Sequence, residues 1–219
     1  MCLILVAWRV HPGFPLVVAA NRDEFHGRPA ARAQFWEDAP EVLAGRDLQA
    51  GGTWLGVSRG GRFAAVTNYR GGTEPGAAQS RGSLVTRYLG GAGVPALAKG
   101  KEAYSGFNLL ASDGDELWWL SNRDGAPRRL EPGWYGLGNL LLDSAEVEPH
   151  KDRLRACPLS MEPLFRSLEP ARIIDARYGT RCSSVLLLGE RTQFAERAFD
   201  ADGVAQTTLH YELSTRRIS

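Results

Sequence analysis

The chain has 219 residues, of which 26 are Lys or Arg and 25 are Asp or Glu, so its formal net charge is +1. With 43% hydrophobic and 23% charged residues, the composition is typical of a globular protein and argues against disorder. This length predicts a single domain over residues 1–219, large enough to bury a core without disulfides or a structural metal. The near-zero net charge gives no electrostatic reason to expect nucleic acid as a partner.

Residues 2–8 form the longest apolar run near the N terminus, far short of the roughly 20 residues that a membrane-spanning helix needs. The basic segment that opens a secretory signal does not precede this run. The three cysteines, Cys2, Cys157 and Cys182, are too widely separated for a CxxC metal site and argue against a disulfide scaffold. We therefore expect a cytoplasmic protein in a reducing compartment, with no stable membrane insertion.

The predicted elements begin with two apolar runs, 2–8 and 16–20, which a Pro-Gly turn separates. Such a pair predicts an antiparallel hairpin of buried strands. Residues 21–36 show little periodicity and predict no regular element. Two further strands are predicted at 53–58 and 62–68, because a Gly pair between them is typical of a hairpin turn.

Helices are predicted in the middle of the chain. Residues 80–89 carry apolar side chains at helical spacing and end at a Gly pair, and 95–104 predicts a weaker helix. A third helix over 151–168 is interrupted by Pro158 and Pro163. The remaining strand-like runs lie at 107–112, 116–121, 133–137, 183–188, 192–199 and 206–213. Strands at both ends of the chain with helices between them predict an α+β layered domain rich in antiparallel hairpins.

Cys2 is the first candidate for chemistry, because removal of Met1 before this small residue would leave it at the N terminus. Its α-amine would titrate near ~7.7–8.0, so a useful fraction would be neutral at pH 7 and could take the thiol proton. One residue would then supply both nucleophile and base at the rigid end of a buried strand. The alternative is a small buried residue that only packs.

A polar NRDE cluster at 21–24 directly follows the second apolar run. The predicted hairpin would return this cluster to the neighbourhood of the candidate thiol. Arg22 would lower the pKa of that thiol, and Asp23 would hold the α-ammonium or orient the amine. The alternative is a polar strand end whose carboxylates pair with Arg28 or Arg32.

Three more polar residues lie at the ends of predicted strands. Asn68 and Asn139 could donate side-chain N–H groups to a developing oxyanion, which stabilises it by roughly a few kcal/mol per donor. Turn formation is the alternative role for both. Arg181, just before the run at 183–188, could bind a substrate carboxylate or phosphate, or could cap the strand.

The sequence lacks the other common catalytic and ligand-binding patterns. The serines at 183 and 184 do not lie in a GxSxG motif. The four histidines, His11, His26, His150 and His210, lack the spacing of paired metal ligands. The Gly-rich segments match neither a P-loop nor GxGxxG. We therefore expect no metal and no cofactor.

Taken in order, these motifs make the chain resemble the NRDE family, also called the transport and Golgi organisation 2 homologues. The resemblance covers essentially the whole chain, and NRDE followed at this distance by GGTWLG is highly specific. It rests on MCLI (1–4), AANRDEFHGRP (19–29), Trp36, AGRDLQAGGTWLGVS (44–58), GRFAAVTNYR (61–70), SRGSLV (80–85), YSGFNLL (104–110), YGLGNLLLDS (135–144) and YGTRCSSVLLL (178–188).

The resemblance implies a relative of the N-terminal-nucleophile hydrolases, with a four-layer αββα sandwich of mostly antiparallel sheets. Similarity to the cholylglycine hydrolase and penicillin V acylase group implies that Cys2 is nucleophile and base, assisted by Arg22 and Asp23. One departure concerns Asp23, because that group separates its Arg and Asp by two residues, whereas here they are adjacent. Side chains of adjacent strand residues point to opposite faces, so the two can share a site only if the chain has left the strand there.

The same similarity implies roles for the other candidates. Asn68 and Asn139 would resemble the asparagines that hold the oxyanion and the amine, and Arg181 the arginine at the start of a late strand. The implied reaction is acyl transfer from a small-molecule amide, in which the C–N bond is broken through a thioester.

The resemblance also implies an alternative of another class. The family is associated with the handling of lipids, acyl-CoA and haem, so the protein could be a non-catalytic carrier of a small acyl or haem-type ligand. Arg22, Arg70 and Arg181 would then be the candidates that bind an anionic group.

Overall fold

The computed structural model describes residues 2–71 and 77–214, which form two compact units. The first unit contains the chain up to Pro29 together with Pro132–Gly138 and Asp143–Ser214. The second unit contains Ala30–Glu131 and Asn139–Leu142. Each unit is built on one sheet of antiparallel neighbours. The single domain over 1–219 stays a prediction.

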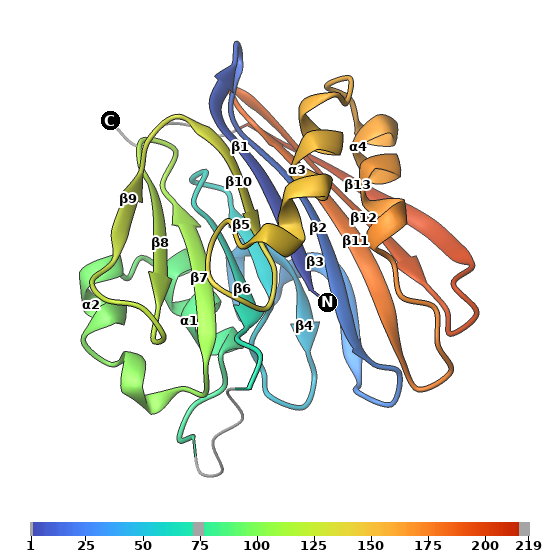
Figure 1. The fold of residues 1–219 in the computed structure, drawn as a ribbon. Coiled ribbons are helices and arrows are strands. Elements are labelled where there is room, and N and C mark those ends of the chain that lie inside the picture. Colours follow the sequence, from blue (N-terminus) through green and yellow to red (C-terminus); the bar gives the residue numbers. More distant parts are fainter. Residues whose placement is uncertain (1, 72–76, 215–219) are drawn as a thin grey trace. The chain divides into compact units, whose positions relative to one another are not determined.

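The first unit carries a six-stranded sheet in the order β10-β1-β2-β11-β12-β13 (Figure 1). Its strands are β1 (Leu3–His11), β2 (Phe14–Phe25), β10 (Gly133–Leu137), β11 (Tyr178–Leu188), β12 (Arg191–Phe199) and β13 (Ala205–Ser214). The two apolar runs at the start of the chain form the predicted hairpin, with Leu3 opposite Asn21. Every residue from Leu3 to Trp8 is buried, which explains the unbroken apolar run, because a strand buried on both faces needs apolar side chains on both.

Two helices, α3 (Glu148–Arg155) and α4 (Met161–Leu168), lie over one face of this sheet (Figure 1). The 3-10 turns η2 (Ala145–Val147) and η3 (Glu169–Ala171) flank this helix pair. The predicted interruption at Pro158 is confirmed, since neither helix includes it. Pro163 instead lies in the first turn of α4, where its missing N–H removes no helical hydrogen bond.

The second unit carries a seven-stranded sheet in the order β3-β4-β5-β6-β7-β8-β9. Its strands are β3 (Ala30–Trp36), β4 (Ala39–Asp47), β5 (Leu55–Ser58), β6 (Phe63–Asn68), β7 (Phe107–Ser112), β8 (Leu117–Ser121) and β9 (Arg128–Leu130). The predicted first helix is confirmed as α1 (Gly82–Leu89), and the predicted second is α2 (Val94–Ala98) followed by the 3-10 turn η1 (Lys101–Ala103). Within 2–71 and 77–214, the helices are all too short or too polar to cross a membrane.

The main departure from the sequence prediction falls on residues 21–36. Strand β2 continues through the NRDE cluster to Phe25, and β3 occupies Ala30–Trp36. Asn21, Arg22 and Asp23 are buried, so this part of β2 is polar without being a solvent-exposed loop. Asp23 and Asn21 accept hydrogen bonds from Thr180 and Ser183 of β11, about 150 residues away in the sequence, so no local apolar pattern marks the strand.

Candidate active site

Cys2 lies directly before β1, beside the polar end of β2. Because Leu3 pairs with Asn21, the antiparallel register places Cys2 next to Arg22. The half-buried Cys2 thiol donates to the backbone oxygen of Asp23 at 3.3 Å, and the backbone N–H of Asp23 donates to Sγ at 3.4 Å. The thiol is therefore held against the backbone of the NRDE cluster, as the predicted hairpin requires.

The surroundings of Cys2 keep its thiol protonated at neutral pH. Burial and then the Asp23 carboxylate raise the pKa of Cys2 to about 11. The hydrogen bond from the Asp23 backbone and the charge of Arg22 act in the opposite direction and lower this pKa, but less strongly. With Met1 in place, the thiol is a poor nucleophile at neutral pH.

Asn21 joins β2 to the helical layer of the first unit. Its Nδ2 donates to the backbone oxygen of Leu168, the last residue of α4, at 3.1 Å. Its Oδ1 accepts a hydrogen bond from Ser183 Oγ on β11 at 2.7 Å. All three groups are buried, so Asn21 satisfies a helix end from within the sheet.

Arg22 and Glu24 lie on the same face of β2, two residues apart. The buried Arg22 guanidinium is 3.9 Å from Glu24 Oε2, and Arg28 Nε approaches the same oxygen to 3.8 Å. Glu24 Oε1 accepts a hydrogen bond from the backbone N–H of Phe25 at 2.8 Å. The alternative of an ion pair between this cluster and Arg28 is therefore confirmed, while Arg22 remains next to Cys2.

Asp23 lies on the opposite face of β2, because the strand has not ended there. It is still paired with Thr180 of β11, and Arg22 with Cys182. The Thr180 hydroxyl donates to Asp23 Oδ1 at 2.6 Å in a buried contact. The side chains of Arg22 and Asp23 are thus not brought together on one face, and Asp23 reaches Cys2 through its backbone.

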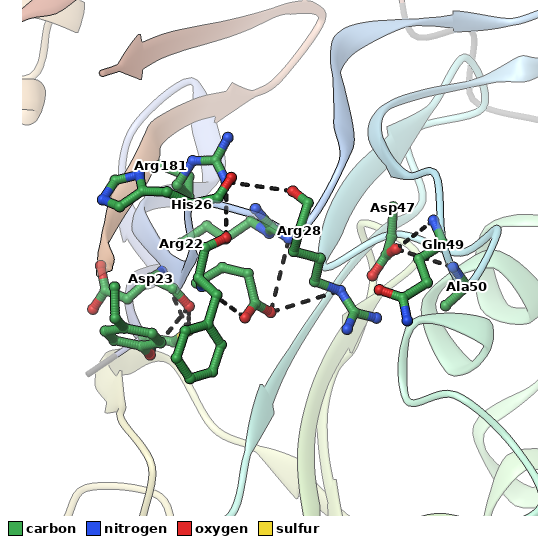
Figure 2. A network of polar contacts seen from close by, with 12 residues as sticks. Arg22, Asp23, His26, Arg28, Asp47, Gln49, Ala50 and Arg181 are labelled. Atoms are coloured by element: carbon green, nitrogen blue, oxygen red, sulfur yellow. Dashed lines mark hydrogen bonds and ion pairs between the residues drawn. The ribbon is translucent and has the colours of Figure 1, made fainter. Parts of the chain in front are cut away.

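Arg181 is the extra residue of a β-bulge in β11, between the positions that pair with Asp23 and Arg22. Its Nη1 donates to the backbone oxygens of Phe25, His26 and Arg28, at 3.0, 3.1 and 3.4 Å (Figure 2). This side chain therefore holds the turn that follows β2. A role in binding an anionic substrate group stays a prediction.

Tyr178, which the sequence analysis missed, lies at the start of β11 and contacts the same backbone as Cys2. Its hydroxyl donates to the backbone oxygen of Asp23 at 3.2 Å. Its ring meets that of Phe25 edge to face, with the centroids 5.2 Å apart. The motif that begins at Tyr178 was visible in the sequence, but no local signal connects this tyrosine to residue 23.

Cys182 is a second thiol near Arg22, on the side away from Cys2. Burial and then the charge of Glu196 raise the pKa of Cys182 well above its ordinary value. Two strand spacings separate Cys2 from Cys182, about 10 Å between backbones, which exceeds the roughly 7 Å limit for a disulfide. Cys182 is therefore an inert buried thiol beside the candidate nucleophile.

Asn68 and Asn139 come together in the second unit. Asn139 Nδ2 donates to the backbone oxygen of Asn68 at 2.8 Å. The backbone N–H of Arg70 in turn donates to the backbone oxygen of Asn139 at 2.6 Å. The next residue, Leu140, accepts a hydrogen bond from Asn108 Nδ2 at 2.9 Å. The two predicted asparagines are therefore neighbours, and a joint role with Cys2 stays a prediction from the sequence.

Within the described parts of the chain, no three His, Cys, Asp or Glu side chains are grouped as metal ligands would be. The chemistry that these residues offer is that of a thiol, a buried guanidinium and backbone donors. Such a set suits nucleophilic attack by sulfur.

Comparison with known proteins identifies relatives of the chain. A family model described as Transport and Golgi organisation 2 matches residues 1–158. The human Transport and Golgi organization protein 2 homolog is 40% identical over 163 residues, which cover 66% of this chain and 59% of that protein. The bovine homolog is 40% identical over 222 residues, which cover 93% of this chain and 77% of the relative. The chain thus spans about three fifths of the length of the human protein.

A solved structure shares the fold. The Caenorhabditis elegans N-acylethanolamine-hydrolyzing acid amidase ortholog superposes with a TM-score of 0.55, covering 85% of this chain and 92% of the other, at 11% sequence identity. At this identity the likeness concerns the fold alone. It confirms the predicted α+β class, the αββα arrangement of the N-terminal-nucleophile hydrolases.

Proposed function

Because the chain belongs to the Transport and Golgi organisation 2 family and has an N-terminal-nucleophile hydrolase fold, we propose that it is an N-terminal cysteine amidohydrolase. The observation that carries the proposal is the position of Cys2, whose thiol lies at the start of β1 against the Asp23 backbone and beside the buried Arg22. The worm protein with this fold is named for hydrolysis of an amide. We propose the same bond type here, with a small-molecule amide as substrate.

The proposed reaction begins after Met1 has been removed. The free α-amine of Cys2 takes the thiol proton, and the thiolate attacks the amide carbonyl carbon. The C–N bond breaks, the leaving amine takes the proton from the α-ammonium, and the acyl group stays on sulfur as a thioester. Water then attacks the thioester, releasing a carboxylic acid and restoring the thiol.

Several groups of the chain would assist these steps. The Asp23 N–H that points at Sγ would stabilise the thiolate, and the Arg22 charge lowers the thiol pKa. Asn68 and Asn139 are the proposed donors to the oxyanion, as the resemblance implies. Removal of Met1 places a positive α-ammonium on the nucleophilic residue itself, so the pKa of Cys2 should fall below the value of about 11 that it has with Met1 present.

The first test is the intact mass of the purified protein, followed by hydrolysis of a fluorogenic N-acyl aminomethylcoumarin. We expect the mass to lack Met1. Cys2→Ala should abolish the release of aminomethylcoumarin, and Cys2→Ser should reduce it by about 100-fold or more, because a hydroxyl is the weaker nucleophile.

Cys157→Ala is the matched control, since Cys157 is a half-buried thiol just after α3 that donates to the backbone oxygen of Pro158 rather than to the NRDE cluster. It should leave the rate unchanged. Full retention of Met1 would contradict the proposal, and so would hydrolysis by the Cys2→Ala protein at the parental rate.

One observation favours a second candidate function, a carrier of a lipid, acyl-CoA or haem-type ligand without turnover. The raised pKa of Cys2 describes a packed thiol rather than a reactive one, while the buried Arg22 supplies a positive charge for an anionic group. For this function, Arg22→Ala should weaken the binding of palmitoyl-CoA by about tenfold, measured by calorimetry.

Two further variants complete the binding test. Cys2→Ala should bind palmitoyl-CoA like the parent, because the carrier needs no thiol. Arg166→Ala is the control for lost charge, since Arg166 is a well-exposed arginine on α4. An unchanged dissociation constant for Arg22→Ala would exclude this arginine from the binding site.

A further inference from the structure

The backbone oxygen of Asp23 accepts two hydrogen bonds from side chains of different strands. One comes from the Cys2 thiol at 3.3 Å and the other from the Tyr178 hydroxyl at 3.2 Å. The thiol also accepts a bond from the Asp23 N–H, so Cys2 contacts both polar backbone groups of this residue. The Tyr178 hydroxyl therefore acts on the group that holds the thiol proton.

We propose that Tyr178 is a positioning residue for Cys2: by sharing the Asp23 carbonyl oxygen, its hydroxyl weakens the hold of that oxygen on the thiol proton. The inference rests on the proposed function in so far as Cys2 is the nucleophile. It adds a residue from β11 that neither the resemblance nor the sequence motifs assigned to the site.

The physical argument concerns the charge on one oxygen atom. A carbonyl oxygen that already accepts a hydroxyl proton is a poorer acceptor for a second donor. When Cys2 loses its proton, the thiolate faces this oxygen without a hydrogen between them, and the Tyr178 hydroxyl then reduces their repulsion. Both effects favour the thiolate over the thiol.

The charged groups around Cys2 and Tyr178 do not replace the effect of the Tyr178 hydroxyl on the thiolate. On β2, Asp23 raises the pKa of Cys2 and Arg22 lowers it. On β11, burial and then the charges of Cys2, Asp23 and Glu24 raise the pKa of Tyr178 well above its ordinary value. The Tyr178 hydroxyl therefore stays protonated, and remains a donor, throughout the pH range in which Cys2 can be titrated.

The ring of Tyr178 contributes separately from its hydroxyl. It packs edge to face on Phe25, which is 57% exposed, so Tyr178→Phe keeps this contact and removes only the donor. Phe25→Leu does the reverse, since it changes the ring contact and leaves the hydroxyl in place. The two substitutions therefore separate packing from hydrogen bonding.

The experiment measures the rate of Cys2 alkylation by iodoacetamide between pH 7.5 and 10, read peptide by peptide by mass spectrometry. For Tyr178→Phe we expect alkylation at pH 8.5 to be about threefold slower than in the parent, with the profile moved upward by about half a pH unit. Phe25→Leu should follow the parental profile. Tyr104→Phe, which removes a hydroxyl bonded to Gln79 in the second unit, should also follow it.

Cys182 provides an internal measure of loosening, because it is buried one strand away from Arg22 in the same sheet. A Tyr178→Phe profile that coincides with the parent or moves to lower pH overturns the proposal. Faster alkylation of both Cys2 and Cys182 overturns it too, since the hydroxyl would then only maintain structure. An upward shift in a protein that hydrolyses no amide would contradict the proposed function and still support the effect of Tyr178 on Cys2.

Discussion

The hydroxyl of Thr180 has a direction that its neighbours fix. Its oxygen accepts a hydrogen bond from the backbone N–H of Ile173 at 2.9 Å and lies 2.6 Å from Asp23 Oδ1. Since the Ile173 N–H can only donate, the hydroxyl proton of Thr180 points to the carboxylate. Asp23 Oδ1 is therefore an acceptor for a residue that also supports the loop before β11.

Thr180→Val tests this arrangement. We expect it to lower the free energy of unfolding by about 2 kcal/mol, because a buried carboxylate loses a donor and the Ile173 N–H loses its acceptor. Urea denaturation, with the midpoint and slope fitted together, measures the change. Thr180→Ser keeps the hydroxyl and should recover most of the loss. Equal stability of the valine and serine proteins would show that the hydroxyl does not matter.

At the residue scale, the sequence predicts the chemistry better than the direction of each side chain. Cys2 and Arg22 lie beside each other, as the hairpin and its polar end indicate. Asp23 points to the other face, because β2 continues past it while paired with β11. Tyr178 is missed altogether, since its contact with residue 23 spans about 150 positions of sequence and leaves no local pattern.

At the scale of elements, a bulge in β11 lies opposite the NRDE cluster. Before the bulge, Thr180 pairs with Asp23, and after it Cys182 pairs with Arg22. The residue between them, Arg181, is released from the pairing and reaches the turn after β2 (Figure 2). The bulge thus frees a charged side chain for the turn without interrupting the sheet.

Arg181→Ala should therefore loosen this turn first. We expect faster amide hydrogen exchange at residues 25–28 and a loss of about 1–2 kcal/mol in the free energy of unfolding, since one half-exposed guanidinium nitrogen contacts three carbonyl oxygens. Arg181→Lys keeps a charged donor and should have a smaller effect. Unchanged exchange in the alanine protein would show that Arg181 does not hold this turn.

The sequence predicts the elements whose buried side chains are apolar. The β1–β2 hairpin and α1 follow directly from apolar runs and helical spacing. The end of β2 was not predicted because its buried residues are polar, and β3 was not predicted because its burial follows no period of two. The three-residue strand β9 is too short to show any pattern.

At the scale of the whole molecule, the six predicted site residues divide between the two units. Cys2, Arg22, Asp23 and Arg181 belong to the first unit, and Asn68 and Asn139 belong to the second. The sequence could predict a strand end for each of them, because polar residues follow apolar runs. It could not predict the division, since membership of a sheet depends on pairings between distant strands rather than on local pattern.

The strand order of the first unit also determines when its strands can pair while the chain is synthesised from its N terminus. The strands of the second unit, β3 to β9, have all been synthesised by residue 130. The outer neighbours of the β1–β2 hairpin, β10 and β11, lie after residue 130, so the hairpin cannot pair with them until later. The Cys2 thiol and the Asp23 backbone can meet in the early hairpin, and Tyr178 and Thr180 join them only when the last third of the chain has emerged. We therefore expect Cys2 to be more accessible while the second unit forms than after β11 has paired with β2.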